Sequence, residues 1–256
     1  NDPGGPLPVR HCAWRAQLHW LLDRSARIIV PSHDVYRRIA RFIDTQRCVV
    51  AYHPEAGPLR TIVPTTADPR PTLLDQVDAP LHVAVVWVLA AHKGGEFLQA
   101  CEAVARYEEM PLRFTAIGGT TPHTRLSPYS GLTITGRYDE ADLVGLLTHL
   151  RPNLVWFPAQ SPETFSYTLS TALKFAYPVA VPDIGAFSER VAGRPWSWVL
   201  AWDQLPEAAC ATLSRLRSAH FRTGVGPMPP AGQAAEETHC FYPEDYLAPI
   251  PRRQRR

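Results

Sequence analysis

Apolar runs alternate with amphipathic stretches along most of this chain. From residue 82 onward, short runs that are apolar throughout are separated by segments whose apolar residues recur three or four positions apart, the spacing of a helix with one buried face. The strands expected from the apolar runs cover residues 83–89, 112–117, 132–135, 154–157, 179–181 and 198–201. The helices expected between them cover residues 96–109, 140–149, 164–176, 187–192 and 205–220. Uniformly apolar strands separated by helices predict an α/β, Rossmann-like parallel sheet with helices on both faces.

The chain before residue 82 continues the same alternation more weakly. A helix is expected over residues 10–24, a strand over 27–32, a helix started by Ser32 over 34–42, and a strand over 48–53. Residues 54–81 hold six prolines and read as a linker, and residues 222–236 are rich in Gly, Pro and Ala. The domain organisation expected from these shifts is an N-terminal segment with linker over 1–80, a Rossmann-like domain over 81–220, and a linker with C-terminal tail over 221–256.

Composition places the chain among ordinary soluble proteins. Of 256 residues, 45% are hydrophobic and 20% are charged, and 26 basic against 24 acidic residues leave a net charge of +2. This balance argues against nucleic acid as a partner. The basic end, residues 252–256, is interpreted as a solvated tail with too few charges to hold a membrane surface alone. The polar opening lacks an initiator methionine, from which we expect a piece of a longer protein.

The five cysteines are scattered and form no CxxC pair, so neither a zinc site nor a disulfide framework is expected. Reduced thiols are the simplest interpretation, which favours a cytoplasmic location, with contact to the inner face of the membrane left open. No apolar run is long enough to cross a bilayer.

Two of the loops that lead from a predicted strand into a helix carry glycines. In the first, Lys93 with Gly94 is a plausible cradle for a diphosphate, because glycine allows close backbone approach and the ammonium group adds charge. The alternative is an exposed lysine in a plain turn. In the second, Gly118 and Gly119 permit a turn or a nearby ligand, and a plain turn is the more frequent case. The full GxGxxG pattern is missing, which argues against a nicotinamide cofactor.

A third loop places Glu163 between two predicted strands, directly before the helix expected over 164–176. A helix start offers N–H groups and partial positive charge to a phosphate, and a nearby carboxylate can accept hydrogen bonds from hydroxyl groups. Together they indicate a ligand with both phosphates and hydroxyls, such as a nucleotide-sugar. Taken alone, Glu163 is better explained as a first-turn carboxylate that stabilises the helix dipole, and the binding role is favoured only because Lys93 and the glycines share the same sheet edge.

Several of these runs together resemble a known family. Ala91–Gly94, Ile117-Gly118, Thr135–Tyr138, Leu154–Ser170 and Pro182–Arg190 are similar to the donor-binding, C-terminal half of retaining GT-B glycosyltransferases, in the style of bacterial enzymes that build surface polysaccharide. The resemblance covers roughly residues 25–205, and the block 154–170 is its most specific part.

The resemblance implies a nucleotide-sugar donor as substrate, with no metal and no cofactor. Glu163 would contact the transferred sugar as the catalytic residue, Lys93 would neutralise the diphosphate, and the nucleotide base would lie near Arg137. The remaining donor-binding positions implied are Gly94, Gly118, Tyr138, Phe165, Ser166, Tyr167 and Thr171. A hexosyltransferase-like enzyme of this kind takes a glycan or lipid-linked acceptor and needs an N-terminal GT-B domain, of which residues 10–53 would be the last part.

Some residues depart from the family pattern. Thr171 stands where a second glutamate would grip the ribose, Ala176 replaces a glycine expected to close the helix, and Trp87 and Ala90 replace glycines or arginine before the lysine. These departures keep two alternatives open: a non-catalytic, degenerate GT-B module that acts in binding or assembly, and a sugar-nucleotide epimerase of related architecture.

Overall fold

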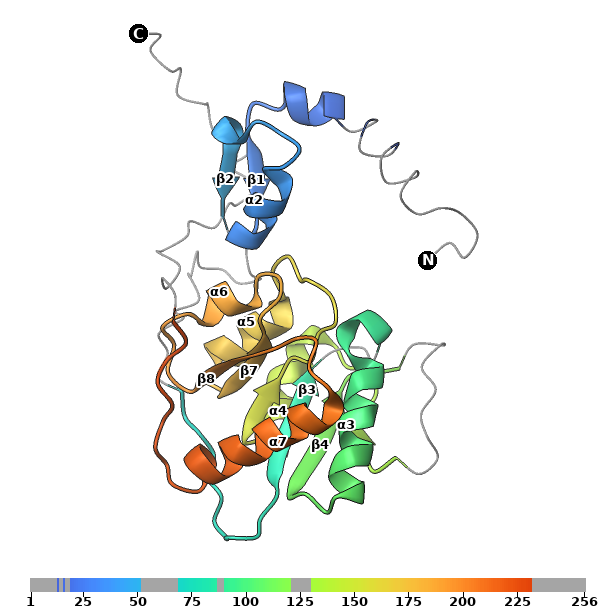
Figure 1. Cartoon of the computed structure of the whole chain (residues 1–256), viewed down its shortest axis with the longest axis vertical. Coiled ribbons are helices and arrows are strands. Elements are labelled where there is room, and N and C mark those ends of the chain that lie inside the picture. The colour runs from blue at the N-terminus through green and yellow to red at the C-terminus, as the bar shows by residue number, and fades with distance from the viewer. Residues whose placement is uncertain are drawn as a thin grey trace. The chain divides into compact units, whose positions relative to one another are not determined.

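The computed structural model describes residues 13, 16, 19–51, 69–86, 90–120 and 130–231 (Figure 1). The chain divides into two compact units, with the described residues up to 51 in one and those from 69 onward in the other. Each unit has its own parallel sheet, so each is described separately.

The smaller unit is a strand–helix–strand element. Its described residues contain β1 (Ile28–Val30) paired in parallel with β2 (Cys48–Val50), joined through helix α2 (His33–Ile39) and a 3₁₀ turn (Thr45–Arg47). The predicted N-cap is confirmed, since the side chain of Ser32 accepts a hydrogen bond from the backbone N–H of Val35 at 3.2 Å. The strand expected over 48–53 ends at Val50, and residues 52 and 53 lie outside the described residues.

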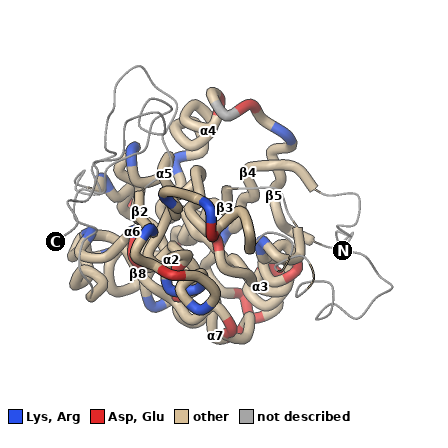
Figure 2. Tube along the Cα trace, turned by 90° about the horizontal axis from the view of Figure 1, so that it is seen from above, with Lys and Arg blue, Asp and Glu red and all other residues tan. Residues whose placement is uncertain are grey.

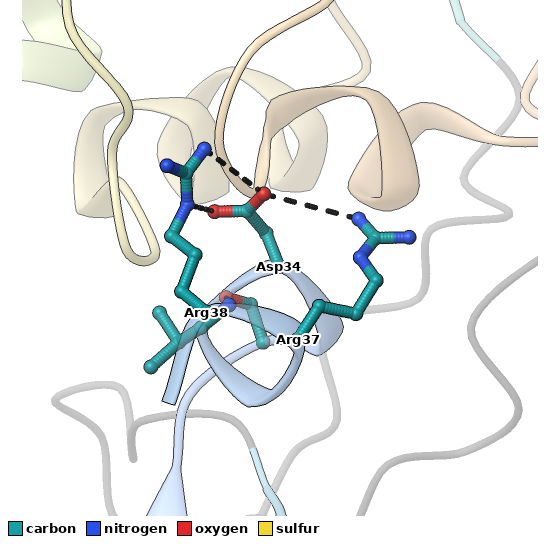
Figure 3. Close-up of polar contacts among 5 residues, drawn as sticks. Asp34, Arg37 and Arg38 are labelled. Atoms are coloured by element: carbon teal, nitrogen blue, oxygen red, sulfur yellow. Dashed lines mark hydrogen bonds and ion pairs between the residues drawn. The ribbon is translucent and has the colours of Figure 1, made fainter. Parts of the chain in front are cut away.

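Helix α2 is stabilised by charge on its surface. Asp34 lies in the first turn, where a negative side chain is favourable, and Figure 3 shows two arginines of the next turn reaching back to it. Arg38 donates from Nε and from Nη2 at 2.6 and 3.2 Å, and Arg37 lies 3.8 Å away. The hydrogen bond from Arg38 raises the pKa of that guanidinium, as expected for an i, i+4 ion pair on a helix.

The larger unit has the predicted doubly wound parallel sheet. In its described part, six strands lie in the order β5-β4-β3-β6-β7-β8, and every neighbouring pair is parallel. The strands are β3 (Leu81–Val86), β4 (Leu112–Ile117), β5 (Thr133–Ile134), β6 (Leu154–Trp156), β7 (Val179–Pro182) and β8 (Ser197–Leu200). All residues of β3, β6 and β7 are buried, as expected for strands covered on both faces.

Helices cover both faces of this sheet. They are α3 (Gly95–Tyr107), α4 (Leu143–Leu150), α5 (Tyr167–Lys174), α6 (Phe187–Val191) and α7 (Pro206–Leu216), with 3₁₀ turns at Ala91–Lys93 and Glu140–Asp142 and a π turn at Arg217–Phe221. α3 and α7 pack together, and both contact β4 (Figure 1). Crossovers between parallel strands are right-handed. The connections that contain α5 and α6 step across the sheet in the opposite direction to the one that contains α3, so these two helices lie on the other face.

Most element boundaries differ from the sequence expectation by one or a few residues, those of β3, α5 and α7 among them. The strand expected over 83–89 is β3, which begins at Leu81 and ends at Val86, and residues 87–89, Trp87 among them, lie outside the described residues. The helix expected over 205–220 ends in a π turn from Arg217. The helix expected over 164–176 begins only at Tyr167, because Ser166 has a φ of 74° that no α-helix accommodates.

Charged residues of both signs are distributed along the described chain (Figure 2). Within the described ranges no helix combines the length and the apolar character that a membrane span needs.

Candidate functional site

The six-stranded sheet changes its winding direction between β3 and β6. The chain runs outward from β3 through β4 to β5, returns to place β6 beside β3, and then runs outward on the other side. Open α/β sheets bind ligands in the crevice that such a switch leaves beyond the carboxyl ends of the two central strands. The loops that follow β3 and β6 therefore form the candidate site.

Lys93 and Glu163 meet at this crevice. The ammonium group of Lys93, from the loop after β3, forms an ion pair with Oε1 of Glu163, from the loop after β6. Their side chains are 29% and 19% exposed, so solvent or a ligand can reach both. The sequence placed these two residues in one site, and the structure brings them into contact.

The same two loops are tied together through their backbones. The carbonyl oxygen of His92 accepts hydrogen bonds from the backbone N–H of Gln160 at 3.1 Å and from the hydroxyl of Ser161 at 3.2 Å. Gly94 has a φ of 85°, and a Cβ at this position would collide with the carbonyl oxygen of Pro158. Only glycine therefore fits beside Lys93, and the position of the lysine is set by this tight contact.

Glu163 is fixed from its other side by the loop after β7. The backbone N–H of Ala186 donates to the carbonyl oxygen of Glu163 at 2.9 Å. Gly185 has a φ of 70°, and a Cβ there would lie 2.6 Å from the backbone nitrogen of Glu163. The carboxylate thus projects from a backbone held by two neighbouring loops.

The start of α5 lies just beyond Glu163. Ser166 is the N-cap, and its hydroxyl accepts from the backbone N–H of Leu169 at 3.3 Å. Its φ of 74° and ψ of 94° lie in a sparsely populated region, and such strain is often found at functional sites. Because the helix begins at Tyr167, Glu163 precedes it by a short loop, and the interpretation of Glu163 as a first-turn dipole partner is wrong.

The contacts of Thr171, Phe165 and Tyr167 with one another lie within α5 and the residues just before it. The hydroxyl of Thr171 donates back to the carbonyl oxygen of Tyr167 at 3.3 Å, a bond within the helix. The rings of Phe165 and Tyr167 meet edge to face at 5.4 Å, with Phe165 buried and Tyr167 49% exposed. Thr171 therefore offers one hydroxyl at the position where the family resemblance expects a carboxylate.

The other predicted donor-binding residues lie on the β4–β5 side of the crevice. The backbone N–H of Gly118 donates to the hydroxyl of Thr135 at 3.2 Å, which joins the loops after β4 and β5. A Cβ on Gly119 would lie 3.0 Å from Cγ of Arg137, so the exposed arginine stem lies directly on this glycine. Tyr138 packs against the hydrophobic core. The structure thus joins the loops after β4 and β5 through Gly118 and Arg137, and the loops after β3 and β6 through Lys93 and Glu163.

Arg190 is a part of the site that the sequence reasoning did not single out. It is buried on α6 (3% exposed) and donates to the carbonyl oxygens of Phe165 and Ser166 at 2.9 and 2.8 Å and to the hydroxyl of Ser170 at 2.7 Å. Its guanidinium also lies 4.1 Å from the ring centroid of Phe165. The sequence does not mark this arginine as buried, because Ser188 and Glu189 precede it in α6 and its partners come from another loop.

Among the described residues, no group of three or more His, Cys, Asp or Glu side chains is placed to hold a metal ion.

The doubly wound sheet with this crevice is the Rossmann-like α/β class, and solved structures narrow the fold further. The chain superposes on HepE from Anabaena in complex with UDP and glucose (13% identity, TM-score 0.56, covering 79% of this chain and 56% of that one). It superposes likewise on the lipopolysaccharide outer core galactosyltransferase WaaB (17% identity, TM-score 0.56, 77% and 54%). A third is sucrose-phosphate synthase from Thermosynechococcus elongatus (16% identity, TM-score 0.56, 84% and 54%). The fold is that of GT-B glycosyltransferases.

At these identities the likeness establishes the fold, and it covers a little more than half the length of each of these solved chains. No protein-family model matches the sequence, and no curated protein matches it either.

Proposed function

We propose that this chain is the donor-binding part of a glycosyltransferase that transfers a sugar from a nucleotide-sugar. The observation that carries the proposal is the ion pair of Lys93 and Glu163 at the switch point of the sheet. A cation and a carboxylate side by side suit a ligand in which a diphosphate is joined directly to a hydroxyl-rich ring. The GT-B fold and the UDP, glucose and UDP-glucose bound to HepE structures support it.

In this proposal each side of the pair takes one part of the donor. The ammonium group of Lys93 leaves the carboxylate and neutralises the diphosphate, assisted by the N–H groups at the start of α5. The carboxylate of Glu163 then accepts hydrogen bonds from the sugar. Gly118, Arg137 and Tyr138, on the β4–β5 side, face the nucleotide base, and Thr171 faces the ribose.

The chemistry assigned to the site is electrostatic. As the bond between the sugar and the diphosphate breaks, negative charge grows on the leaving diphosphate and positive charge on the sugar ring. Lys93 and the helix start lower the energy of the first charge, and Glu163 that of the second. This scheme requires neither a metal ion nor a cofactor.

The finer assignment follows from the resemblance to retaining enzymes of surface polysaccharide synthesis. We propose transfer of a hexose to a glycan or lipid-linked acceptor, in the cytoplasm or at the inner face of the membrane. The acceptor would be held by an N-terminal GT-B domain, to which the β1–α2–β2 element of the smaller unit corresponds.

A second candidate, a non-catalytic module that binds a nucleotide-sugar without transferring it, is favoured by Thr171. A single hydroxyl that already bonds within its own helix holds a ribose less firmly than the two oxygens of a carboxylate.

The test is ligand-induced thermal stabilisation of the full chain with UDP, GDP, ADP and dTDP and their sugars. We expect one nucleotide series to raise the melting temperature, and Lys93→Met and Glu163→Gln to abolish the rise. Lys174→Met and Glu207→Gln, at exposed positions of α5 and α7, are the matched controls. A flat response across the panel contradicts both candidates, whereas binding without sugar release or transfer favours the second.

A further inference from the structure

Two consecutive carbonyl groups, those of Phe165 and Ser166, point at the same buried guanidinium. Both accept from Nη1 of Arg190, at 2.9 and 2.8 Å, while Nη2 holds the hydroxyl of Ser170 at 2.7 Å. One planar side chain on α6 therefore fixes two successive peptide groups and the first turn of α5.

The direction of these carbonyls sets the direction of the N–H groups that follow them. In a trans peptide the C=O and the next N–H point to opposite sides of the chain. The N–H groups of Ser166 and Tyr167 consequently point away from Arg190. Tyr167 is the first residue of α5, so its N–H projects from the amino end of the helix, where partial positive charge is greatest.

This inference rests on the proposed function. We propose that Arg190 positions the backbone N–H groups of Ser166 and Tyr167, which together form a diphosphate-binding site, the diphosphate seat. By holding the two carbonyls inward, it keeps the N–H groups of Ser166 and Tyr167 turned outward as a pair of donors for the phosphate oxygens of the donor. Arg190 itself is 3% exposed and acts through these peptide groups rather than by touching the ligand.

The backbone at this point needs such a hold. Ser166 adopts a φ of 74°, which costs a non-glycine residue roughly 1 kcal/mol or more and persists only when neighbouring contacts enforce it. The carbonyl oxygen of Ser166 also accepts from the backbone N–H of Ser170 at 3.3 Å, so the peptide group before Ser166 depends most on Arg190. Without the Arg190 bond, rotation of that peptide group would relieve this conformation and turn the carbonyl oxygen of Phe165, which repels phosphate, toward the diphosphate. The guanidinium also stacks on Phe165, which fixes the residue before the cap.

A second buried arginine supplies the matched control. Arg194 is 2% exposed and donates to the carbonyl oxygen of Tyr177 and the hydroxyl of Ser197, both at 2.9 Å, away from the start of α5. Loss of Arg194 removes a buried cation and comparable hydrogen bonds from the same unit, so it reproduces the general cost of losing a core arginine.

The experiment compares the wild-type full chain with Arg190→Met, Arg190→Lys, Arg194→Met and Arg194→Lys. Amide hydrogen exchange is followed over residues 163–170 and 177–197, and binding of UDP and of inorganic pyrophosphate is measured by calorimetry. For Arg190→Met we expect faster exchange over 163–170 and pyrophosphate binding weakened roughly tenfold or more, since hydrogen bonds to a charged group are lost. Arg190→Lys keeps the positive charge but not the planar guanidinium with its several N–H donors, so it should bind pyrophosphate more tightly than Arg190→Met and less tightly than wild type. Arg194→Met should speed exchange only over 177–197 and leave binding unchanged.

Each outcome decides one of the two proposals. Unchanged exchange over 163–170 in Arg190→Met, or equal loss of binding in Arg194→Met, overturns the positioning role. If Arg190→Met does not fold, Arg190→Lys must still weaken binding more than Arg194→Lys does. A wild type that binds pyrophosphate but no nucleotide refutes the proposed function and leaves the anion seat standing. A wild type that binds neither refutes both.

Discussion

Lys93 and Glu163, 70 positions apart in the chain, form an ion pair across the point where the sheet changes its winding direction. Neither residue owes its place to local structure alone. Lys93 is set by the contact of Gly94 with Pro158, and Glu163 by the bond from Ala186. The pair is therefore a property of three loops that the parallel sheet brings to one edge.

The first prediction is that Lys93→Met or Glu163→Gln changes stability little. Both side chains are partly exposed, and such ion pairs contribute about 0–1 kcal/mol to the free energy of unfolding. Urea unfolding should show this small change, whereas Leu154→Ala in the core should cost about 2–5 kcal/mol. A loss as large as that of Leu154→Ala would make the pair a structural element and weaken its assignment to a ligand.

The second prediction contrasts two glycines of the same unit. Gly94→Ala should lower the free energy of unfolding by about 2 kcal/mol or more and displace Lys93. Residue 94 has a left-handed φ, and its new Cβ would collide with the carbonyl oxygen of Pro158. Gly145→Ala, inside α4 where nothing lies within 4 Å, should instead stabilise by about 0.5–1 kcal/mol. Thermal unfolding of both variants measures these two effects. Equal changes in melting temperature would contradict the close approach of the loop after β3 to the loop after β6.

The parallel sheet could be predicted from the sequence because its strands are buried on both faces. In β4, four of the six residues are apolar and the last four are buried, and its predicted bounds, Leu112–Ile117, are those of the structure. The proximity of Lys93 and Glu163 was also expected from the sequence, since the carboxyl ends of parallel strands share an edge.

What the sequence could not predict depends on contacts between distant loops. Ser166 looks like a residue inside a helical run, but it has a positive φ, and its carbonyl oxygen accepts from Arg190 of another helix. The start of α5 was therefore placed three residues too early. Arg190 itself carried no pattern, because a buried arginine is explained only by the carbonyls it meets.

The third prediction concerns the missing carboxylate of α5. If the proposed donor site is correct, Thr171→Glu should tighten binding of the preferred nucleotide-sugar roughly tenfold, since a carboxylate accepts from two ribose hydroxyls. Thr171→Gln, similar in size but uncharged, should gain clearly less. Calorimetric titration gives both affinities, and weaker binding by the glutamate variant would place the ribose elsewhere.

The fourth prediction concerns the end of the same helix. Ala176 has a φ of 60°, while the N–H groups of Tyr177 and Ala176 bond the carbonyls of Ala172 and Leu173 at 3.0 Å, the pattern of a Schellman cap. Ala176→Gly should stabilise by about 0.5–1 kcal/mol, because glycine adopts this conformation without strain. Ala172→Gly, inside the helix, should destabilise by about 1 kcal/mol or more. Melting temperatures of the two variants should move in opposite directions.

The last prediction is a pH dependence that arises from His82 on β3. Its side chain is buried, with Nε2 2.8 Å from the hydroxyl of Thr115, and burial, helped by the charge of Arg113, lowers its pKa to about 4. In the unfolded chain the imidazole has its usual pKa of about 6.5. Between these values the unfolded state binds a proton that the folded state does not, so the folded state loses stability as the pH falls from about 6.5 to about 4.

The loss from this group can reach about 3 kcal/mol, since one pKa unit corresponds to about 1.4 kcal/mol. Carboxylates also titrate near the lower end of this range, so the quantity to measure is the difference between wild type and His82→Gln. Urea unfolding at pH 7.5, 6 and 5 should show a steeper fall for wild type, because glutamine keeps a polar partner for Thr115 but takes up no proton. Parallel curves for the two proteins would mean that His82 is protonated in the folded state, and that β3 tolerates a charge between its two layers of helices.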